Sequence, residues 1–357
     1  MNKAKSLFLF FILISALLAA TGCVKIKNTK DTSSIDGGVF KSSDRGQTWK
    51  QKISIPTISG KPGNFAGVNA ASMAIDPNDN QAIYFGSVGS GLLYSYDGGN
   101  SWQTAKGLAN MTIRSVTVDP KSKCVIYASA ANKVYKSTDC SRSWSKIYFD
   151  NNLTATVDAL AIDHFDSSKV YIAVSRGDII KSSDNGESWQ TIYRINKKVN
   201  KIVINPFDSR NIYVLTSNKG IFYSHDSGDS WKDLNSVLKE FELKFAAKDL
   251  KFALGGEDKL IFLATTYGML KSKDNGATWE KIELIPSEKN AAINAMAINP
   301  KNSQEIYYVT NTTFYRSIDG GQNWTPSKLP TTRAGWQLLI DPQQPNTIYM
   351  GVKRVAK

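Results

Sequence analysis

The chain has 357 residues, and its 44 Lys and Arg against 31 Asp and Glu give a formal net charge of +13. A positive surplus of this size favours anionic partners, although most surface lysines serve only to keep a protein hydrated. The two histidines, His164 and His225, lie far apart in the sequence. We therefore expect neither a His-ligated metal centre nor a Ser-His-Asp triad, and no cofactor.

Residues 1–22 have the pattern of an export signal. Lys3 and Lys5 precede an apolar run of 14 residues, from Leu7 to Ala20, which is too short to span a bilayer as a helix. The small residues before Cys23 resemble the lipobox of bacterial lipoproteins, in which this cysteine is lipidated after cleavage. Cleavage at another position, which would leave an unlipidated thiol, is the alternative. Export makes nucleic acid a poor candidate for a partner.

A polar tether, residues 23–36, leads to a region in which one short pattern recurs. Near-copies of S-x-D-x-G-x-[ST]-W occur seven times, and successive copies begin 42 to 53 residues apart. A repeat in this range indicates a propeller or a solenoid. The aspartates and tryptophans of these boxes are Asp44 and Trp49, Asp97 and Trp102, Asp139 and Trp144, Asp184 and Trp189, Asp226 and Trp231, Asp274 and Trp279, and Asp319 and Trp324.

Each repeat predicts four short strands. An apolar alternation that ends in Asp-Pro or Asn-Pro, as in "MAIDP" to Pro77, precedes a second β-rich run such as Ile83-Tyr84; a third strand, the box and a fourth strand follow. Four antiparallel strands of this kind make one propeller blade. Six full units run from about Asn69 to Ser327, and the half units at the two chain ends complete a seventh blade, which removes the free sheet edges.

The boxes themselves are predicted to be structural. The Asp side chain and the Ser two residues before it can accept hydrogen bonds from backbone N–H groups of a turn, and Gly supplies a positive φ. The Trp ring can cover the hairpin and the neighbouring blade. One carboxylate per turn falls short of the oxygen ligands that Ca²⁺ prefers, so we expect no metal at these turns.

The boxes resemble the Asp-box repeats of bacterial neuraminidases, sortilin-type receptors, xyloglucanases and photosystem II assembly-factor-like proteins. Seven copies on one domain most resemble the last group and Asp-box lipoproteins. The resemblance implies an all-β, seven-bladed β-propeller of four-stranded antiparallel blades over residues 37–357, with the last blade shared by both chain ends. It says little about function, because one fold hosts many activities. The Arg-Ile-Pro opening of neuraminidases has its nearest match in Ser54-Ile55-Pro56, which lacks the Arg.

The two remaining cysteines fall in the second blade. Cys124 begins the second strand, and Cys140 lies in the box, where Ser141 stands in place of the Gly. Adjacent antiparallel strands would bring the two cysteines together, so we predict a disulfide that braces a weakened turn. Two buried free thiols are the alternative.

Candidate binding residues lie near the start of the inner strands. Aligning these strands on the Asp-Pro position predicts a ring of side chains around the mouth of the central channel, which includes Ala71 and Leu250. The polar and aromatic members of this ring are Arg114, Asp158, Asn200, Asn294 and Trp336. Convergent polar groups beside an aromatic ring are typical of a binding site. The alternative is that they only solvate the mouth and pair with one another.

Basic side chains also gather on the predicted loops of the third and fourth blades. This basic rim consists of Arg176, Arg194, Lys197, Lys198 and Lys219. A positive rim can steer an acidic partner toward the protein. Loops that are merely solvated are the alternative.

These patterns favour a monomeric, non-catalytic lipoprotein of the bacterial cell envelope, outside the cytoplasm and held to a membrane through its lipid anchor. Its propeller would bind a protein partner or an envelope complex, with an acidic partner favoured, as a scaffold or assembly factor. The alternative is a carbohydrate-active propeller, either a glycoside hydrolase or a glycan-binding protein. In that case Asp158 would need a second carboxylate, which the sequence does not place.

The predicted anchor can be tested by replacing Cys23 with Ala. The variant should move from the membrane fraction to the soluble fraction, because acyl chains contribute roughly 0.8 kcal/mol per buried CH₂ to membrane binding. Fractionation followed by immunodetection measures the change, with Cys124→Ala as the control. Equal membrane retention of Cys23→Ala and wild type would contradict lipidation.

Overall fold

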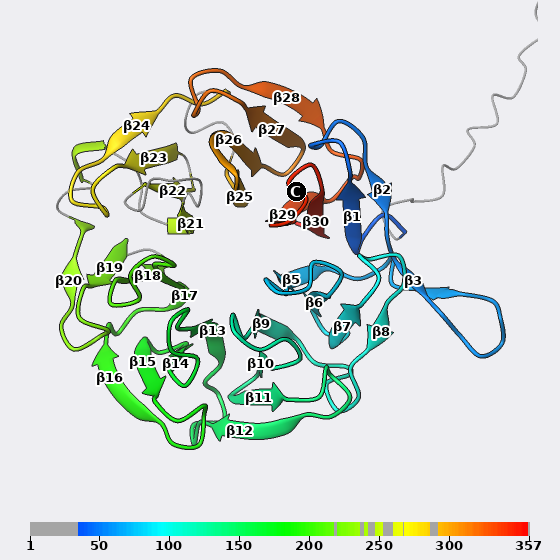
Figure 1. The fold of residues 1–357 in the computed structure, drawn as a ribbon, viewed down its shortest axis with the longest axis horizontal. Coiled ribbons are helices and arrows are strands. Elements are labelled where there is room, and N and C mark those ends of the chain that lie inside the picture. Colours follow the sequence, from blue (N-terminus) through cyan, green and yellow to red (C-terminus); the bar gives the residue numbers. More distant parts are fainter. Residues whose placement is uncertain are drawn as a thin grey trace, which may run out of the picture. The chain divides into compact units, whose positions relative to one another are not determined.

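The computed structural model describes residues 35–217, 220–235, 239–241, 247–252, 260–266, 268–285 and 292–355. Within these residues, seven four-stranded antiparallel sheets form a closed ring, which confirms the predicted seven-bladed β-propeller (Figure 1). The predicted signal peptide and Cys23 lie outside the described residues. In the part of the chain that is described, no helix is long and apolar enough to cross a membrane.

The first six blades each use four consecutive strands, ordered from the channel outward. Blade 1 contains β5 (Ala70–Ile75), β6 (Ile83–Ser87), β7 (Leu92–Ser95) and β8 (Gln103–Thr104), and blade 2 contains β9 (Ile113–Val118), β10 (Ile126–Ala130), β11 (Lys133–Ser137) and β12 (Ser145–Phe149). Blade 3 contains β13 (Val157–Ile162), β14 (Val170–Val174), β15 (Asp178–Ser182) and β16 (Gln190–Arg194), and blade 4 contains β17 (Val199–Ile204), β18 (Ile212–Thr216), β19 (Ile221–Ser224) and β20 (Lys232–Asp233). Blade 5 contains β21 (Ala247–Phe252), β22 (Ile261–Thr265), β23 (Gly268–Ser272) and β24 (Glu280–Ile282), and blade 6 contains β25 (Ala295–Asn299), β26 (Asn302–Val309), β27 (Thr313–Ser317) and β28 (Thr325–Lys328).

Blade 7 combines the two chain ends, as predicted. Its inner strands are β29 (Ala334–Ile340) and β30 (Ile348–Lys353), and its outer strands are β1 (Val39–Ser42) and β2 (Lys50–Gln51). The pairing of β1 with β30 runs from Val39 opposite Gly351 to Ser42 opposite Ile348. This one strand pair closes the ring, so neither chain end leaves an unpaired edge in the blade interior.

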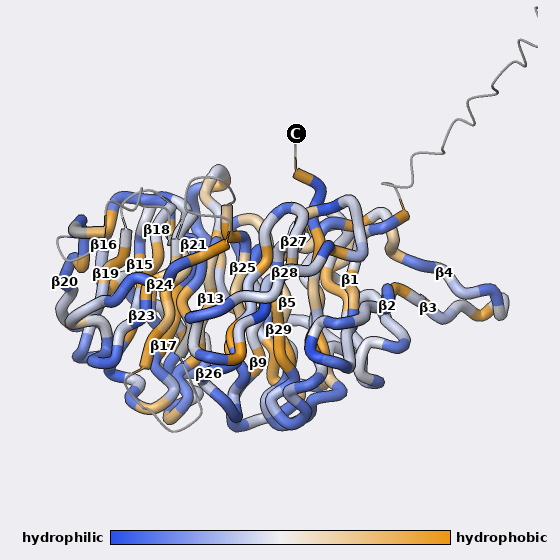
Figure 2. Tube along the Cα trace, turned by 90° about the horizontal axis from the view of Figure 1, so that it is seen from above, coloured by the Kyte–Doolittle hydropathy of each residue, from blue (hydrophilic) through white to orange (hydrophobic). Residues whose placement is uncertain are grey.

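The hydrophobic core is divided among the blade interfaces. Seven apolar clusters occur in the described residues, and each joins side chains of two neighbouring blades. The second strands contribute most, since all five residues of β6, β10, β14, β18 and β22 are buried. Figure 2 shows the apolar residues on the strands and the hydrophilic residues on the turns at both ends of the ring. Because each cluster is completed by a neighbouring blade, its burial stabilises a blade only when that neighbour is folded beside it.

Each box forms the same hydrogen-bonded turn. In blade 3, Ser182 Oγ donates to Asp184 Oδ1 at 2.7 Å and accepts from Gly186 N at 2.8 Å, while Asp184 Oδ1 also accepts from Ser188 N at 2.9 Å. The residue after the box Asp and the residue that follows it both have positive φ in all seven boxes. In blade 2 these two residues are Cys140 and Ser141, at φ 59° and 65°. Ser141 therefore adopts the left-handed conformation at the position that glycine occupies in the other six boxes.

The boxes also bind the preceding blade, a contact that the sequence did not reveal. In four blades, a buried tyrosine on the second strand donates its hydroxyl to the carbonyl of the residue after the box Asp in the next blade. These pairs are Tyr127 with Asn185 (3.3 Å), Tyr171 with Ser227 (3.2 Å), Tyr213 with Asn275 (2.8 Å) and Tyr349 with Gly98 (3.1 Å). The left-handed conformation of this residue thus directs its carbonyl away from its own blade and toward the preceding blade.

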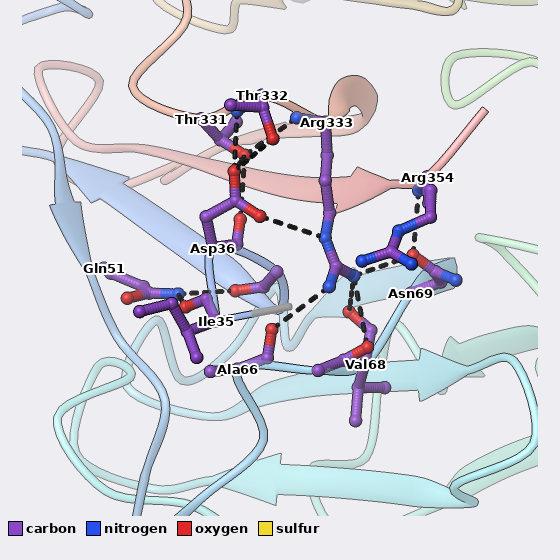
Figure 3. A network of polar contacts seen from close by, with 12 residues as sticks. Ile35, Asp36, Gln51, Ala66, Val68, Asn69, Thr331, Thr332, Arg333 and Arg354 are labelled. Atoms are coloured by element: carbon purple, nitrogen blue, oxygen red, sulfur yellow. Dashed lines mark hydrogen bonds and ion pairs between the residues drawn. The ribbon is translucent and has the colours of Figure 1, made fainter. Parts of the chain in front are cut away.

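A second network of polar contacts joins Asp36, close to the first described residue, to residues that precede blades 1 and 7 (Figure 3). The side chain of Arg333 is only 2% exposed, and its Nε pairs with Asp36 Oδ1 at 3.3 Å. Its Nη1 donates to Val68 O at 3.1 Å and to Asn69 Oδ1 at 2.8 Å, and Asp36 Oδ2 also accepts from Thr332 N at 2.7 Å. One guanidinium therefore joins the first described residues, the entry to blade 1 and the entry to blade 7.

One element was not predicted from the sequence. Between blades 7 and 1 the chain forms a two-stranded ribbon of β3 (Ser54–Ile55) and β4 (Gly63–Asn64), which projects sideways from the ring (Figure 1, Figure 2). Ile58 at its tip is fully exposed. The ribbon lies in the stretch that was compared with the neuraminidase opening, and the described connections between the other blades contain no second ribbon of this kind.

Cys124 and Cys140 meet at the end of blade 2. Their Cα atoms lie 3.9 Å apart, and the structure joins the two residues as a disulfide. The backbone adds a hydrogen bond from Cys140 N to Cys124 O at 3.2 Å. Since Cys140 is also the residue after the box Asp, the disulfide lies in the box that lacks its Gly.

The box aspartates predict how stability depends on pH. Hydrogen bonds from the hydroxyl and backbone N–H four residues on hold the pKa of Asp44, Asp139 and Asp184 at about 2, below the ordinary 3.8. Because these pKa values are depressed in the folded state, the carboxylates stabilise it above about pH 4, and this stabilisation is lost as the pH falls toward about 2. The unfolding temperature should therefore drop steeply over that interval.

Circular dichroism melts between pH 6 and pH 2 measure this dependence. An Asp139→Asn and Asp184→Asn double variant should be less stable than wild type at pH 6 and should lose less stability between pH 4 and pH 2. Parallel profiles for the two proteins would contradict the assignment.

Arg333 provides a test of ring closure. Replacing it with Met should lower the free energy of unfolding by about 3 to 5 kcal/mol, because the partly buried carboxylate of Asp36 and several carbonyls lose their partner. Arg210→Met, which removes an exposed pair with Asp208, should cost no more than about 1 kcal/mol. Chemical denaturation measures both variants, and equal losses would contradict a special role for Arg333.

Candidate functional site

The mouth of the channel is built by a repeated irregularity of the inner strands. In six of the seven blades the inner strand shifts register at one residue near its start, so that this residue has no partner on the second strand. Such a bulge re-aims a side chain. The bulged residues, together with Asn294 of blade 6, line a cavity of about 230 Å³.

The structure brings together the residues that were predicted to ring the mouth. Ala71, Arg114, Asp158, Asn200, Asn294 and Trp336 all line this cavity. Leu250 is the exception, because it is fully buried in the apolar cluster between blades 4 and 5. The bulge of blade 5 falls at Lys248 instead, since this repeat is not in step with the Asp-Pro alignment.

Asp158 is held in the mouth by cations, with one oxygen left over. Its side chain is 6% exposed, and Oδ1 accepts from Thr156 Oγ1 at 2.8 Å and lies 3.5 Å from Arg114 Nη1. Oδ2 is buried without a hydrogen-bond partner, 3.9 Å from Lys198 Nζ. A buried carboxylate oxygen without a hydrogen bond is costly, which makes it a candidate contact for a ligand.

A second carboxylate, Asp249 of β21, lines the same cavity. It forms an ion pair with Lys201 of β17, and its two oxygens accept from Leu250 N at 3.0 Å and from Met296 N at 3.3 Å. The sequence analysis missed Asp249 because it aligned blade 5 two residues out of step. An alignment on the strand itself puts Lys248 at the bulge and Asp249 directly after it.

Trp336 places an aromatic ring at the edge of the mouth. The residue is half-buried, and Lys353 Nζ of β30 lies 4.0 Å from the centroid of its ring, in a cation–π contact. Lys353 is opposite Ala334, at the start of the inner strand. The strand β30, which is not an inner strand, therefore places the cation of Lys353 beside the mouth.

The predicted basic rim is largely neutralised in the structure. Arg176 pairs with Asp150 at 2.8 Å and with Asp178, and Arg194 lies 3.3 Å from Asp178. Lys198 faces Asp158, Lys197 has no recorded ion pair among the described residues, and Lys219 lies outside them. The two arginines of the rim are thus balanced by Asp150 and Asp178, and Lys198 belongs to the charges of the mouth.

A larger and more apolar cavity, of about 400 Å³, lies mainly along β13, β17 and the residues that follow them. It is lined mainly by Leu160, Ile202 and Ile204, and it shares Lys201 with the mouth. His164 borders it, and burial lowers the pKa of its imidazole. Across the described ranges, no group of three or more His, Cys, Asp or Glu could hold a metal ion.

Comparison with known proteins identifies relatives for part of the chain. The Sortilin-Vps10 family model, described as "Sortilin, neurotensin receptor 3", matches residues 177–270 and 267–356. A xyloglucanase from Paenibacillus sp. is 30% identical over 31% of this chain. The match covers 13% of that relative's length, so the chain corresponds to a small part of the enzyme.

Two solved structures have the same fold. A GH74 xyloglucanase from Xanthomonas campestris superposes with a TM-score of 0.65 at 16% identity, over 80% of this chain and 51% of that chain. YCF48 bound to a D1 peptide superposes with a TM-score of 0.63 at 16% identity, over 84% and 95% of the two chains. At this identity the likeness concerns the fold alone.

These comparisons correct the functional interpretation of the sequence. The expected non-catalytic scaffold or assembly factor, and with it the expectation that the protein is no enzyme, is wrong, because the curated relatives that match are xyloglucanases. The alternative of a carbohydrate-active propeller has the better support. The boxes alone could not indicate this function, because they occur in many classes of protein and do not distinguish among them.

Proposed function

We propose a carbohydrate-active function for the propeller of this chain, which belongs to the Sortilin-Vps10 family, since the family model matches just over half of its residues. The channel mouth binds a glycan and hydrolyses a glycosidic bond. The observation that carries the proposal is the buried oxygen of Asp158 without a hydrogen bond, in a cavity that also contains Asp249 and Trp336. The partial match to xyloglucanases supports it.

The two carboxyl groups supply the chemistry. In glycoside hydrolysis one carboxyl group gives a proton to the leaving glycosidic oxygen, and the other takes a proton from the attacking water or attacks the sugar carbon itself. Asp158 and Asp249 are the two carboxylates among the described residues that line the mouth. They lie on strands of blades 3 and 5, so the inner strand of blade 4 separates them.

Their surroundings assign different roles. Both oxygens of Asp249 accept hydrogen bonds from backbone N–H groups, and Lys201 forms an ion pair with it. We therefore assign Asp249 the role of the fixed carboxylate. Asp158 keeps Oδ2 free of hydrogen bonds within the described structure. We assign it the exchange of a proton with the glycosidic oxygen, which requires the buried carboxylate to rotate so that one oxygen contacts the substrate.

The remaining residues of the mouth position the sugar. The ring of Trp336 offers a flat apolar surface for the carbon face of a sugar, and Asn294 offers an amide for its hydroxyls. A cavity of about 230 Å³ is smaller than the pockets of about 300 to 1,000 Å³ that hold drug-sized ligands. It therefore accommodates about one sugar unit, with the rest of the glycan across the mouth.

The setting that we propose for this activity is the bacterial cell envelope. It would be reached through the export signal in residues 1–22 and the lipidated Cys23. This part of the proposal rests on the sequence pattern.

Replacing Asp158 with Asn tests the proposed chemistry. The turnover number on a susceptible polysaccharide should fall by about 10² to 10⁴, because an amide cannot donate and accept the transferred proton. Release of reducing sugar from xyloglucan and from a panel of other polysaccharides measures this loss.

Asp229→Asn, an exposed aspartate in the box of blade 4, is the matched control and should keep the wild-type rate. Hydrolysis that survives in a folded Asp158→Asn variant would remove Asp158 from the mechanism. A wild-type protein that cleaves no polysaccharide in the panel would contradict the proposed function as a whole.

A further inference from the structure

We propose that the glycan bound at the channel mouth is acidic, carrying carboxylate or sulfate groups, and that Lys248 and Lys353 bind its charge beside Trp336. This inference rests on the proposed function and specifies its substrate class. It departs from the neutral polysaccharide that the xyloglucanase match alone would suggest.

The first support is the balance of charge in and around the cavity. Five cationic side chains gather there and face two carboxylates, Asp158 and Asp249. The cations are Arg114, Lys198, Lys201, Lys248 and Lys353. A net positive charge in a concave site with protein walls raises the local concentration of anions.

The second support is how the ion pairs are distributed. Arg114 and Lys198 both face Asp158, and Lys201 is paired with Asp249. Among the ion pairs of the described residues, none involves Lys248 or Lys353. Both carboxylates of the mouth are thus occupied by other cations, and the two lysines remain as binding groups for an external anion.

The third support is the proximity of these lysines to each other. Burial lowers the pKa of Lys353, and repulsion from Lys248 and Lys198 lowers that pKa further. Like charges at close range are unfavourable unless an anion lies between them. An anionic group of the ligand would relieve this repulsion, which favours charged over neutral glycans.

Trp336 explains why the anion should be part of a sugar. Lys353 Nζ lies 4.0 Å from the ring centroid, so a cation and a flat apolar surface are presented side by side. A free inorganic anion would use only the lysines. A uronic acid or a sulfated sugar has both an apolar carbon face and a charged substituent, and it would use both groups.

The test compares charged and neutral forms of the same glycan on the full-length protein. Isothermal titration measures binding of a galacturonan oligosaccharide and of its fully methyl-esterified form, in which each carboxylate is a neutral methyl ester. A sulfated galactan oligosaccharide and its desulfated form make a second pair, which distinguishes carboxylate from sulfate. Xyloglucan oligosaccharide is the neutral reference.

In at least one pair the charged form should bind about tenfold more tightly than the neutral form. One added contact between opposite charges at a partly exposed site contributes about 1.4 kcal/mol, which corresponds to a factor of ten. The preference should shrink as salt is raised. It should disappear in a Lys248→Gln and Lys353→Gln double variant.

A double variant of Lys50→Gln and Lys232→Gln carries the same change of charge at the exposed first residues of β2 and β20, and it should keep the wild-type preference. Equal binding of charged and neutral forms, or tighter binding of xyloglucan, would overturn this inference and leave the proposed function standing. Binding of an acidic peptide by a protein that binds none of these glycans would overturn both.

Discussion

The whole propeller depends on one backbone conformation, the left-handed residue after the aspartate of each box. This conformation lets the aspartate and the serine close the turn within the blade, and in four blades it exposes a carbonyl that a tyrosine of the preceding blade reaches. A single turn therefore serves two interfaces. Because each apolar cluster is also shared by two blades, a blade has little stability of its own, and the ring forms as a cooperative unit.

Much of the fold could be predicted because its signals are local. The boxes, the Asp-Pro turns and the half units at the two ends determine the number of blades and the closing of the ring. The ring of mouth residues follows from the same repeat, and it fails only in blade 5, where Leu250 is buried and Lys248 takes its place. A repeat predicts equivalent positions only as long as its spacing holds.

The contacts that complete the site are long-range and have no such signal. Asp249 of blade 5 forms an ion pair with Lys201 of the adjacent blade 4, and Lys353 of the strand β30 contacts the ring of Trp336. The basic rim shows the same difficulty in reverse, because Asp150 and Asp178 neutralise arginines that look unpaired in the sequence. Local charge counts cannot separate a balanced cluster from a binding surface, since the difference depends on which carboxylates the fold brings near.

The seam between β1 and β30 also determines how the ring would respond to mechanical tension. A pull on the chain before Ile35 would first reach Asp36 and its contact with Arg333, and then the paired residues from Val39 to Ser42. Tension directed along β1 would load its hydrogen bonds simultaneously in shear, whereas a perpendicular pull would break them one after another. An immobilised molecule would therefore resist drag along that strand best.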